Sequence, residues 1–235
     1  VQCSDVRNHY VSDLNNRQLY SNEPEVEELL MNSKELRATT SNQDVIRHSD
    51  IIFTYVPTPS LEDGSYDVNA VWKVVDDFKA ASDVLAGKSL VVGCTTNPGD
   101  CDLFQEQLAS YGVDVYYNPE FIAQGSIIND LRYADMVLIG GTGKHTSVLD
   151  EIYEKIQDGF RDPSIHNMST RAAELTKIAV NCFLTTKISY ANMLGQVLSK
   201  SGLEDEIDQV LESIGSDSRV GNKNLKFGYE FGGRC

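Results

Sequence analysis

The sequence lacks the main features of membrane, nucleic-acid-binding and disulfide-stabilised proteins. No apolar run approaches the roughly 20 residues that a membrane-spanning helix needs. Basic residues are few, 20 against 35 acidic ones, and the net charge of −15 argues against nucleic acid as a partner. The cysteines form no Cys-x-x-Cys pair, which disfavours a disulfide framework or a zinc ribbon and favours a reducing cytoplasm. They are Cys3, Cys94, Cys101, Cys182 and Cys235.

A dinucleotide-binding glycine turn is also absent, because Gly-x-Gly-x-x-Gly occurs nowhere in the chain. Asp5 nevertheless closes a strand-like run at 1–5, where an acidic residue that accepts ribose hydroxyls would end the second strand of such a fold. Taken alone, Asp5 is more typical of an ordinary turn residue. Because the chain begins with Val1 and ends at Cys235, we expect a fragment whose first strand and glycine turn lie upstream.

The composition is that of an ordinary globular protein, with 41% apolar and 23% charged residues. As far as residue 145, short apolar runs alternate with helical patterns and are separated by glycine and proline. This alternation predicts a doubly wound, parallel α/β sheet of the Rossmann type. The patterns predict strands at 1–5, 50–56, 89–93, 113–117 and 136–140, and helices at 8–17, 25–31, 69–81, 102–110 and 145–157.

The last third is predicted to be helical. The segment 169–200 contains no proline and one glycine, which predicts a single helix of about 30 residues with Ser169 or Thr170 as its cap and Gly202 at its end. Helices of this length often pack against a partner subunit, so we expect a homodimer through this segment. A further amphipathic helix is predicted at 203–214, followed by a loop.

Short motifs follow the predicted strands in a definite order. They are Val56-Pro57-Thr58-Pro59, Thr95-Thr96-Asn97-Pro98-Gly99, Asn118-Pro119-Glu120-Phe121, Glu174-Leu-Thr-Lys177-Ile-Ala-Val-Asn181, Arg219-Val220-Gly221 and Phe231-Gly232-Gly233-Arg234-Cys235. The succession resembles the UDP-glucose/GDP-mannose dehydrogenase family. The resemblance covers essentially the whole chain and is densest at 118–141.

The resemblance implies NAD-dependent oxidation of a nucleotide sugar, in which a primary alcohol becomes a carboxylate and two NAD⁺ are used in succession. It implies an N-terminally truncated NAD-binding domain at 1–166 and a helical central domain at 167–235, with the C-terminal sugar-nucleotide domain absent. The stretch 118–121 favours UDP-glucose. Siblings that oxidise UDP-N-acetylmannosamine or GDP-mannose remain open, and so does a non-catalytic Rossmann module. A glycine turn about 20 residues before Asp5 would support the enzyme.

Catalysis in this family implies a cysteine nucleophile. A thiolate that captures the aldehyde intermediate gives a thiohemiacetal, which can lose a second hydride and become a thioester. Cys235 lies in a Gly-Gly-x-Cys context that matches this role. Lys177 and Asn181 are four residues apart and share a helix face, where they would stabilise the oxyanion. Glu120 would be the base for hydrolysis, and Thr95 would hold the water or a substrate hydroxyl.

The remaining expected contacts are with the cofactor and the substrate. The resemblance places Asp5, Thr58 and Thr95 at NAD, and Asp5 disfavours NADP, although the nearby Arg7 could accommodate a 2′-phosphate. Gln124 stands where many family members carry a second glutamate, so we expect it to position a group and not to accept a proton. The expected substrate-binding residues are Phe121, Ile122, Gln124, Lys177, Arg219 and Gly232.

The isolated chain is expected to be poorly folded and inactive. In the strand order of the fold, the first strand lies centrally, and we expect its place between the strands at 1–5 and 89–93. Its loss would leave two strand edges unpaired. Without the glycine turn the chain would also bind NAD weakly.

Overall fold

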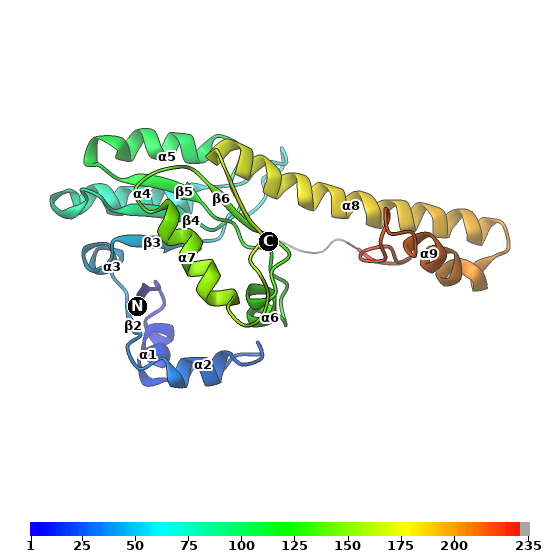
Figure 1. Cartoon of the computed structure of the whole chain (residues 1–235), viewed down its shortest axis with the longest axis horizontal. Helices are drawn as coiled ribbons and strands as arrows, with labels where there is room; N and C mark the ends of the chain where they lie inside the picture. The colour runs from blue at the N-terminus through cyan, green and yellow to red at the C-terminus, as the bar shows by residue number, and fades with distance from the viewer. Residues whose placement is uncertain (231–235) are drawn as a thin grey trace. The chain divides into compact units, whose positions relative to one another are not determined.

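The structure is a computed structural model that describes residues 1–230 (Figure 1). The chain divides into two compact units, Val1–Leu175 and Thr176–Cys235. Phe231 to Cys235, and with them the predicted site residues Gly232 and Cys235, lie outside the described residues.

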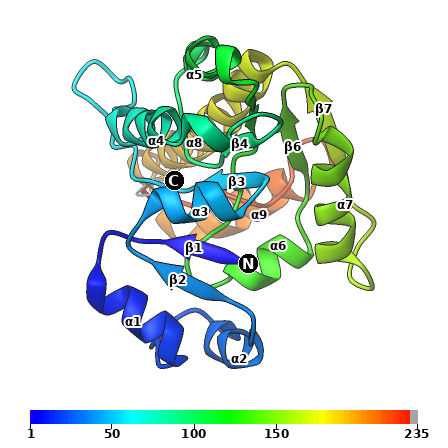
Figure 2. The ribbon, with the colours of Figure 1, turned by 90° about the vertical axis from the view of Figure 1, so that its left-hand side faces the viewer.

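The first unit is built on a five-stranded sheet with the order β3-β4-β5-β6-β7. Figure 2 labels four of these strands, β3, β4, β6 and β7. Its neighbouring strands are parallel except for β5 and β6, which are antiparallel and pair through Tyr117 and Gly140. The predicted Rossmann-type, predominantly parallel fold is therefore confirmed, whereas neither the antiparallel pair nor β7 is predicted by the sequence pattern. The strands are β3 (Ile51–Thr54), β4 (Ser89–Val92), β5 (Asp114–Tyr117), β6 (Val137–Gly140) and β7 (Ile165–Met168).

The two N-terminal strands form a separate parallel pair, β1 (Gln2–Ser4) with β2 (Arg37–Thr39). In the larger sheet β4 is paired on both sides, by β3 and β5. The expectation that a strand position lies open beside residues 89–93 is therefore wrong, and among the described residues the strand with a free edge on that side is β3. Three helices accompany the small pair, α1 (Asn8–Asn16), α2 (Val26–Asn32) and α3 (Asn42–His48).

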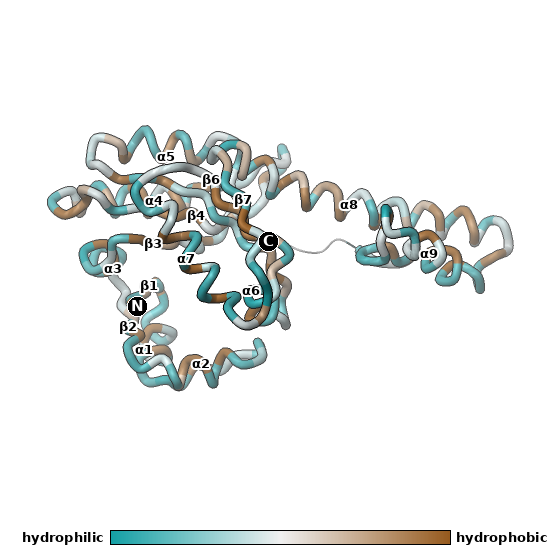
Figure 3. The backbone as a smooth tube through the Cα atoms, in the orientation of Figure 1, coloured by the Kyte–Doolittle hydropathy of each residue, from teal (hydrophilic) through white to brown (hydrophobic). Residues whose placement is uncertain are grey.

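Helices cover both faces of the five-stranded sheet. Leu90 and Val92 face a core with Phe78 of α4 (Asn69–Ala80) and Phe104 of α5 (Asp100–Leu108). Successive strand residues point to opposite faces, so Val91 and Tyr116 pack instead with Leu149 of α7 (Thr146–Gln157). Brown, apolar backbone is visible at β3 and β6 in Figure 3. Burial on both faces explains why β4 and β6 are nearly continuous apolar runs.

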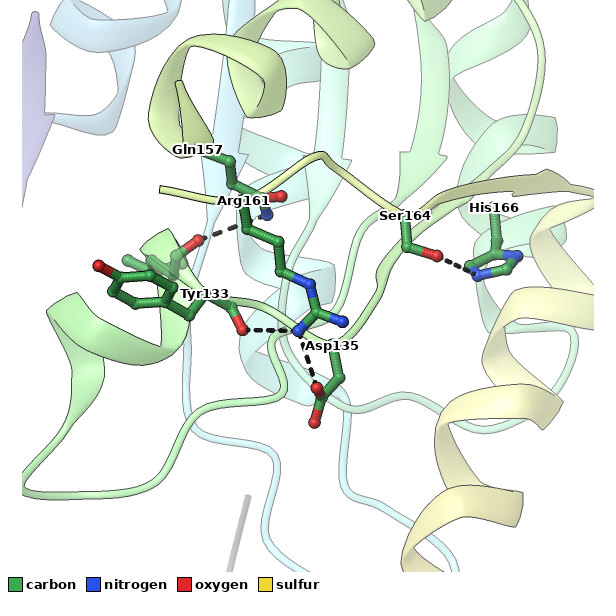
Figure 4. Close-up of polar contacts among 7 residues, drawn as sticks. Tyr133, Asp135, Gln157, Arg161, Ser164 and His166 are labelled. Atoms are coloured by element: carbon green, nitrogen blue, oxygen red, sulfur yellow. Dashed lines mark hydrogen bonds and ion pairs between the residues drawn. The ribbon is translucent and has the colours of Figure 1, made fainter. Parts of the chain in front are cut away.

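The segment after α7 is fastened to the segment before β6 (Figure 4). Arg161 Nη1 donates hydrogen bonds to Asp135 Oδ1 at 2.9 Å and to the Tyr133 carbonyl at 3.3 Å. The buried Gln157 donates through Nε2 to the Leu131 carbonyl at 3.4 Å. These contacts hold α6 (Ile127–Arg132) against the end of α7. Three short 3₁₀ turns complete the described elements, at Ser82–Val84, Ala109–Tyr111 and Glu204–Glu206.

The second unit consists of most of α8 (Thr170–Lys200), α9 (Ile207–Gly215) and the tail that follows. Ser169 Oγ accepts from the Ala172 amide at 3.4 Å, and Gly202 has a φ of 75°, so the long helix begins and ends as predicted. Its core contains Ala191, Leu198 and Leu211. No helix among residues 1–230 is long and apolar enough to cross a membrane.

Candidate active site

The loop between β4 and α5 carries Thr95, which is 3% exposed. On one side of Thr95 the Gly93 amide donates to the Thr54 carbonyl of β3 at 3.0 Å. On the other side Asn97 donates from Nδ2 to the Tyr66 carbonyl at 2.9 Å and accepts from the Tyr66 amide at 2.8 Å. Both attachments fix the loop at the carboxyl end of the sheet, where open α/β folds bind their ligands.

A buried carboxylate in the first turns of α8 accepts hydrogen bonds from the same loop. Glu174 is fully buried and accepts three hydrogen bonds. They come from Thr96 Oγ1 at 2.8 Å, the Gly99 amide at 2.6 Å and the Cys101 amide at 2.9 Å. These amides lie at the N-terminus of α5, where the helix dipole favours a negative charge. Glu174 therefore acts as the cap of α5 although it lies far from it in the sequence.

Glu120 follows β5 and borders a pocket at the end of the sheet. Asn118 just before it is held on two sides: it donates from Nδ2 to the Leu138 carbonyl at 2.9 Å and accepts from Tyr153 Oη at 2.5 Å. Tyr153 thus joins α7 to the strand end that presents Glu120. Glu120 itself is half-buried.

The Tyr153 hydroxyl at this pocket remains protonated over the physiological range. Burial, and less strongly the charge of Glu120, raise the pKa of Tyr153 to about 12. The remaining walls are largely apolar, with Phe121, Ile122, Leu131, Ala134, Met136 and Val137 among them. Glu120 and Asp130 are the acidic side chains that line it.

The loop that follows Glu120 is held by the N-terminal part of the same unit. Glu23 accepts from the Gly125 amide at 2.7 Å and from the Ile127 amide at 3.3 Å. Arg132 Nη1 lies 2.6 Å from Glu25 Oε2. Gln124 is exposed beside this attachment. The predicted substrate loop is therefore anchored by residues about a hundred positions earlier in the chain.

The predicted cofactor residues of this unit are Asp5 and Thr58, together with Thr95. Asp5 follows β1, and Arg7 donates to its two carboxylate oxygens, from Nε at 2.9 Å and from Nη2 at 2.8 Å. These hydrogen bonds lower the pKa of Asp5 to about 2, so the carboxylate is ionised. An ionised carboxylate keeps further lone pairs for ribose hydroxyls. Asp5 at the end of a parallel strand therefore fits NAD, and Thr58 is half-buried.

The other predicted residues belong to the second unit. Lys177 is 3% exposed and Asn181 is half-buried, and both lie on α8. Arg219 is exposed and donates from Nε at 3.0 Å and from Nη2 at 2.6 Å to Asp217. A substrate phosphate would therefore have to compete with Asp217 for this guanidinium.

Two of the described cysteines, Cys94 and Cys101, lie in or beside the Thr95 loop. Burial raises the pKa of Cys94, the cysteine beside Thr95, and raises that of Cys101 further, so both thiols stay protonated. Residues 1–230 contain no cluster of His, Cys, Asp and Glu that could hold a metal.

Residues that the sequence did not single out complete the site. Tyr153, Glu174 and Glu23 support Asn118, the Thr95 loop and the loop after Glu120 respectively. The one indication in the sequence that Glu174 belongs to the site is its place in the same motif as Lys177. The other two are an ordinary helix tyrosine and a loop glutamate, and no local pattern distinguishes them.

Comparisons with known proteins point to one family. Residues 1–157 match the NAD-binding domain of the UDP-glucose/GDP-mannose dehydrogenase family, and residues 171–235 match its central domain. The UDP-glucose 6-dehydrogenase TuaD of Bacillus subtilis is 34% identical over 242 residues, which cover 100% of this chain and 51% of that protein.

Solved structures agree with this match. A UDP-glucose dehydrogenase from Pyrobaculum islandicum has a TM-score of 0.86 at 29% identity, covering 100% of this chain and 55% of that one. A GDP-mannose dehydrogenase from Pseudomonas aeruginosa is similar in fold alone, with a TM-score of 0.79 at 24% identity over 100% of this chain and 56% of that one. The chain spans about half the length of the relatives it matches.

Proposed function

Because this chain belongs to the UDP-glucose/GDP-mannose dehydrogenase family and carries its NAD-binding domain, we propose that the full-length protein oxidises UDP-glucose to UDP-glucuronate. The observation that supports the proposal is the position of Glu120 in this family's fold. Glu120 borders a pocket and follows a strand end that the Tyr153–Asn118 hydrogen bond holds in place. GDP-mannose and UDP-N-acetylmannosamine are the alternative substrates, since relatives of those kinds share the fold.

The reaction needs a covalent stage on the protein. We propose that the Cys235 thiolate adds to the aldehyde carbon formed by the first oxidation, giving a thiohemiacetal. Loss of a hydride from that carbon, with loss of the hydroxyl proton, gives a thioester. Water then cleaves the thioester to the carboxylate and releases the thiol. NAD⁺, when bound, accepts each hydride, and a second NAD⁺ must replace the first NADH.

The protein would supply charge and proton transfer around these steps. Lys177 and Asn181 stabilise the oxyanion of each tetrahedral stage through a cation and an amide donor. Glu120 takes the proton from the hydrolytic water, which Thr95 holds. Gln124 positions a group but accepts no proton, because a neutral amide is not a base at this pH.

The same proposal assigns the binding residues. Asp5, Thr58 and Thr95 contact NAD, and the Asp5 carboxylate disfavours a 2′-phosphate. The nucleotide sugar is held by backbone and side-chain groups. They are Phe121, Ile122, Gln124, Lys177, Arg219 and Gly232. We further propose a domain boundary near residue 166, a cytoplasmic location and a homodimer formed through α8.

The covalent proposal is tested by the amount of NADH formed per sugar. The full-length protein should form two NADH per UDP-glucose, while Cys235→Ala should lose this four-electron oxidation. Cys182→Ala is the matched control because Cys182 is exposed. Formation of two NADH per sugar by Cys235→Ala would reject the covalent stage. If the full-length protein turned over another nucleotide sugar faster than UDP-glucose, that sugar would be assigned as the substrate.

The role of Glu120 is tested in the same assay. Glu120→Gln should give a burst of NADH followed by slow turnover, because the thioester forms but is not hydrolysed. Intact-mass spectrometry should detect the added acyl group on the protein. Steady turnover without a burst or a mass increase would assign the base to another residue.

A further inference from the structure

The loop that carries Thr95 depends on a carboxylate from a different helix. Glu174 is fully buried, and its oxygens accept from Thr96, next to Thr95, and from the amides of Gly99 and Cys101. A buried carboxylate is costly unless its lone pairs are satisfied, and these three donors satisfy it. The contact is therefore a rigid connection between α8 and the loop.

A second contact joins α8 directly to α5 and does not involve the loop. Thr170 Oγ1 donates to Asp102 Oδ1 at 2.6 Å, and Arg171 Nη2 lies 2.9 Å from Asp102 Oδ2. It attaches the start of α8 to α5 at a more exposed position, since the Arg171 side chain is 67% exposed. Packing of the helices and fixation of the loop thus rest on different side chains, which can be changed separately.

We infer that Glu174 is a positioning residue that sets the place of Thr95 for the reaction, an inference that rests on the proposed function. Thr95 is fixed on its N-terminal side by the Gly93 amide, which bonds to β3. On its C-terminal side the next residue, Thr96, is bonded to Glu174. Without the carboxylate the loop keeps its attachments through Gly93 to β3 and through Asn97 to Tyr66, and it loses the one at Thr96, the residue adjacent to Thr95. A catalytic group displaced by about 1 Å can cost about 100-fold in rate.

The substitution Glu174→Gln separates positioning from simple stabilisation. The glutamine amide nitrogen cannot accept from a backbone amide, so at least one of the three donors loses its acceptor. In the full-length protein kcat should fall by about 100-fold, while KM for the nucleotide sugar changes little. Arg171→Gln, which weakens the second contact, is the matched control and should leave kcat unchanged.

A double-mutant cycle identifies the residue through which Glu174 acts. In a Thr95→Ala background Glu174→Gln should lower kcat by no more than about twofold, because the group that it positions is already gone. Thr96→Val removes one of the three donors and keeps the carboxylate, so it should show a smaller loss with the same non-additivity. This milder variant serves if Glu174→Gln does not fold.

Three outcomes are distinguishable. A loss of kcat that is equal in the wild-type and Thr95→Ala backgrounds would overturn the inference and leave the proposed function standing. An unchanged kcat with a lowered melting temperature would do the same, because Glu174 would then only stabilise the fold. If the unsubstituted full-length protein had no nucleotide-sugar dehydrogenase activity, both the proposed function and this inference would be overturned.

Discussion

Side chains at the site are held by residues that are distant in the sequence. Asn118 is bonded to Tyr153, 35 positions later, and Gly125 to Glu23, 102 positions earlier. The sequence predicts Glu120 because it follows an apolar strand and stands in a family motif. It could not predict these supports, because a tyrosine on a helix or a glutamate in a loop takes its role only from the tertiary contact.

A substitution of Gly140, at the end of β6, would test how closely α8 packs on the sheet. A Cβ at this position would lie 2.7 Å from the Ala173 Cβ and 3.0 Å from the Thr170 Cα. Both atoms belong to α8 and cannot move without shifting the helix, so Gly140→Ala should destabilise the protein by about 1–3 kcal/mol. Urea unfolding followed by circular dichroism measures this. Glu154→Ala, at an exposed position, is the control, and equal midpoints for the two variants would contradict the prediction.

At the scale of elements, length and regularity decided what could be predicted. The long helix followed from a segment without proline, and its one glycine, Gly195, lies where a Cβ would overlap the ring of Phe227. The pattern did not predict β2, α3, α6 and β7. β7 is as long as β3 to β6, but two of its residues are exposed and it shows no clear alternation. The antiparallel direction of β6 leaves no trace in composition, since an apolar strand reads alike in both directions.

Apolar side chains on α8 support the proposed dimer. Phe183, Tyr190 and Val197 are exposed and recur every seven residues, and exposed Met193 lies on the same side. Phe183→Ser with Val197→Ser should therefore weaken self-association, because burial of these side chains would be lost. Sedimentation of the full-length protein measures this, with Gln196→Ala as the control on another side of the helix. An unchanged sedimentation coefficient for the double variant would place the interface elsewhere.

At the scale of the whole molecule, alternation of apolar runs and helices was sufficient to predict the α/β class. The strand order expected from the fold class placed an open edge at residues 89–93, whereas among the described residues that edge belongs to β3. The alternation did not predict that two units each have a core of their own, because which apolar residues share a core depends on tertiary packing. The second core is small and comprises Ala191, Leu198, Ile207, Leu211 and Leu225.

Two separate cores predict that the units open independently. Leu211 is 2% exposed in the second core, and Leu211→Ala should cost about 2–5 kcal/mol there. Amides of α9 and the C-terminal half of α8 surround this core, so they should exchange faster with deuterium. Exchange in β3 to β6 should stay as in the wild type.

Leu90→Ala is the reciprocal variant, because Leu90 is fully buried in the core of the first unit. It should raise exchange in the sheet and leave α9 unchanged. Hydrogen exchange measured by mass spectrometry on both variants of the full-length protein gives the comparison directly. If either substitution raised exchange in both units alike, α8 would be transmitting the loss from one core to the other, and the two units would unfold as a single cooperative block.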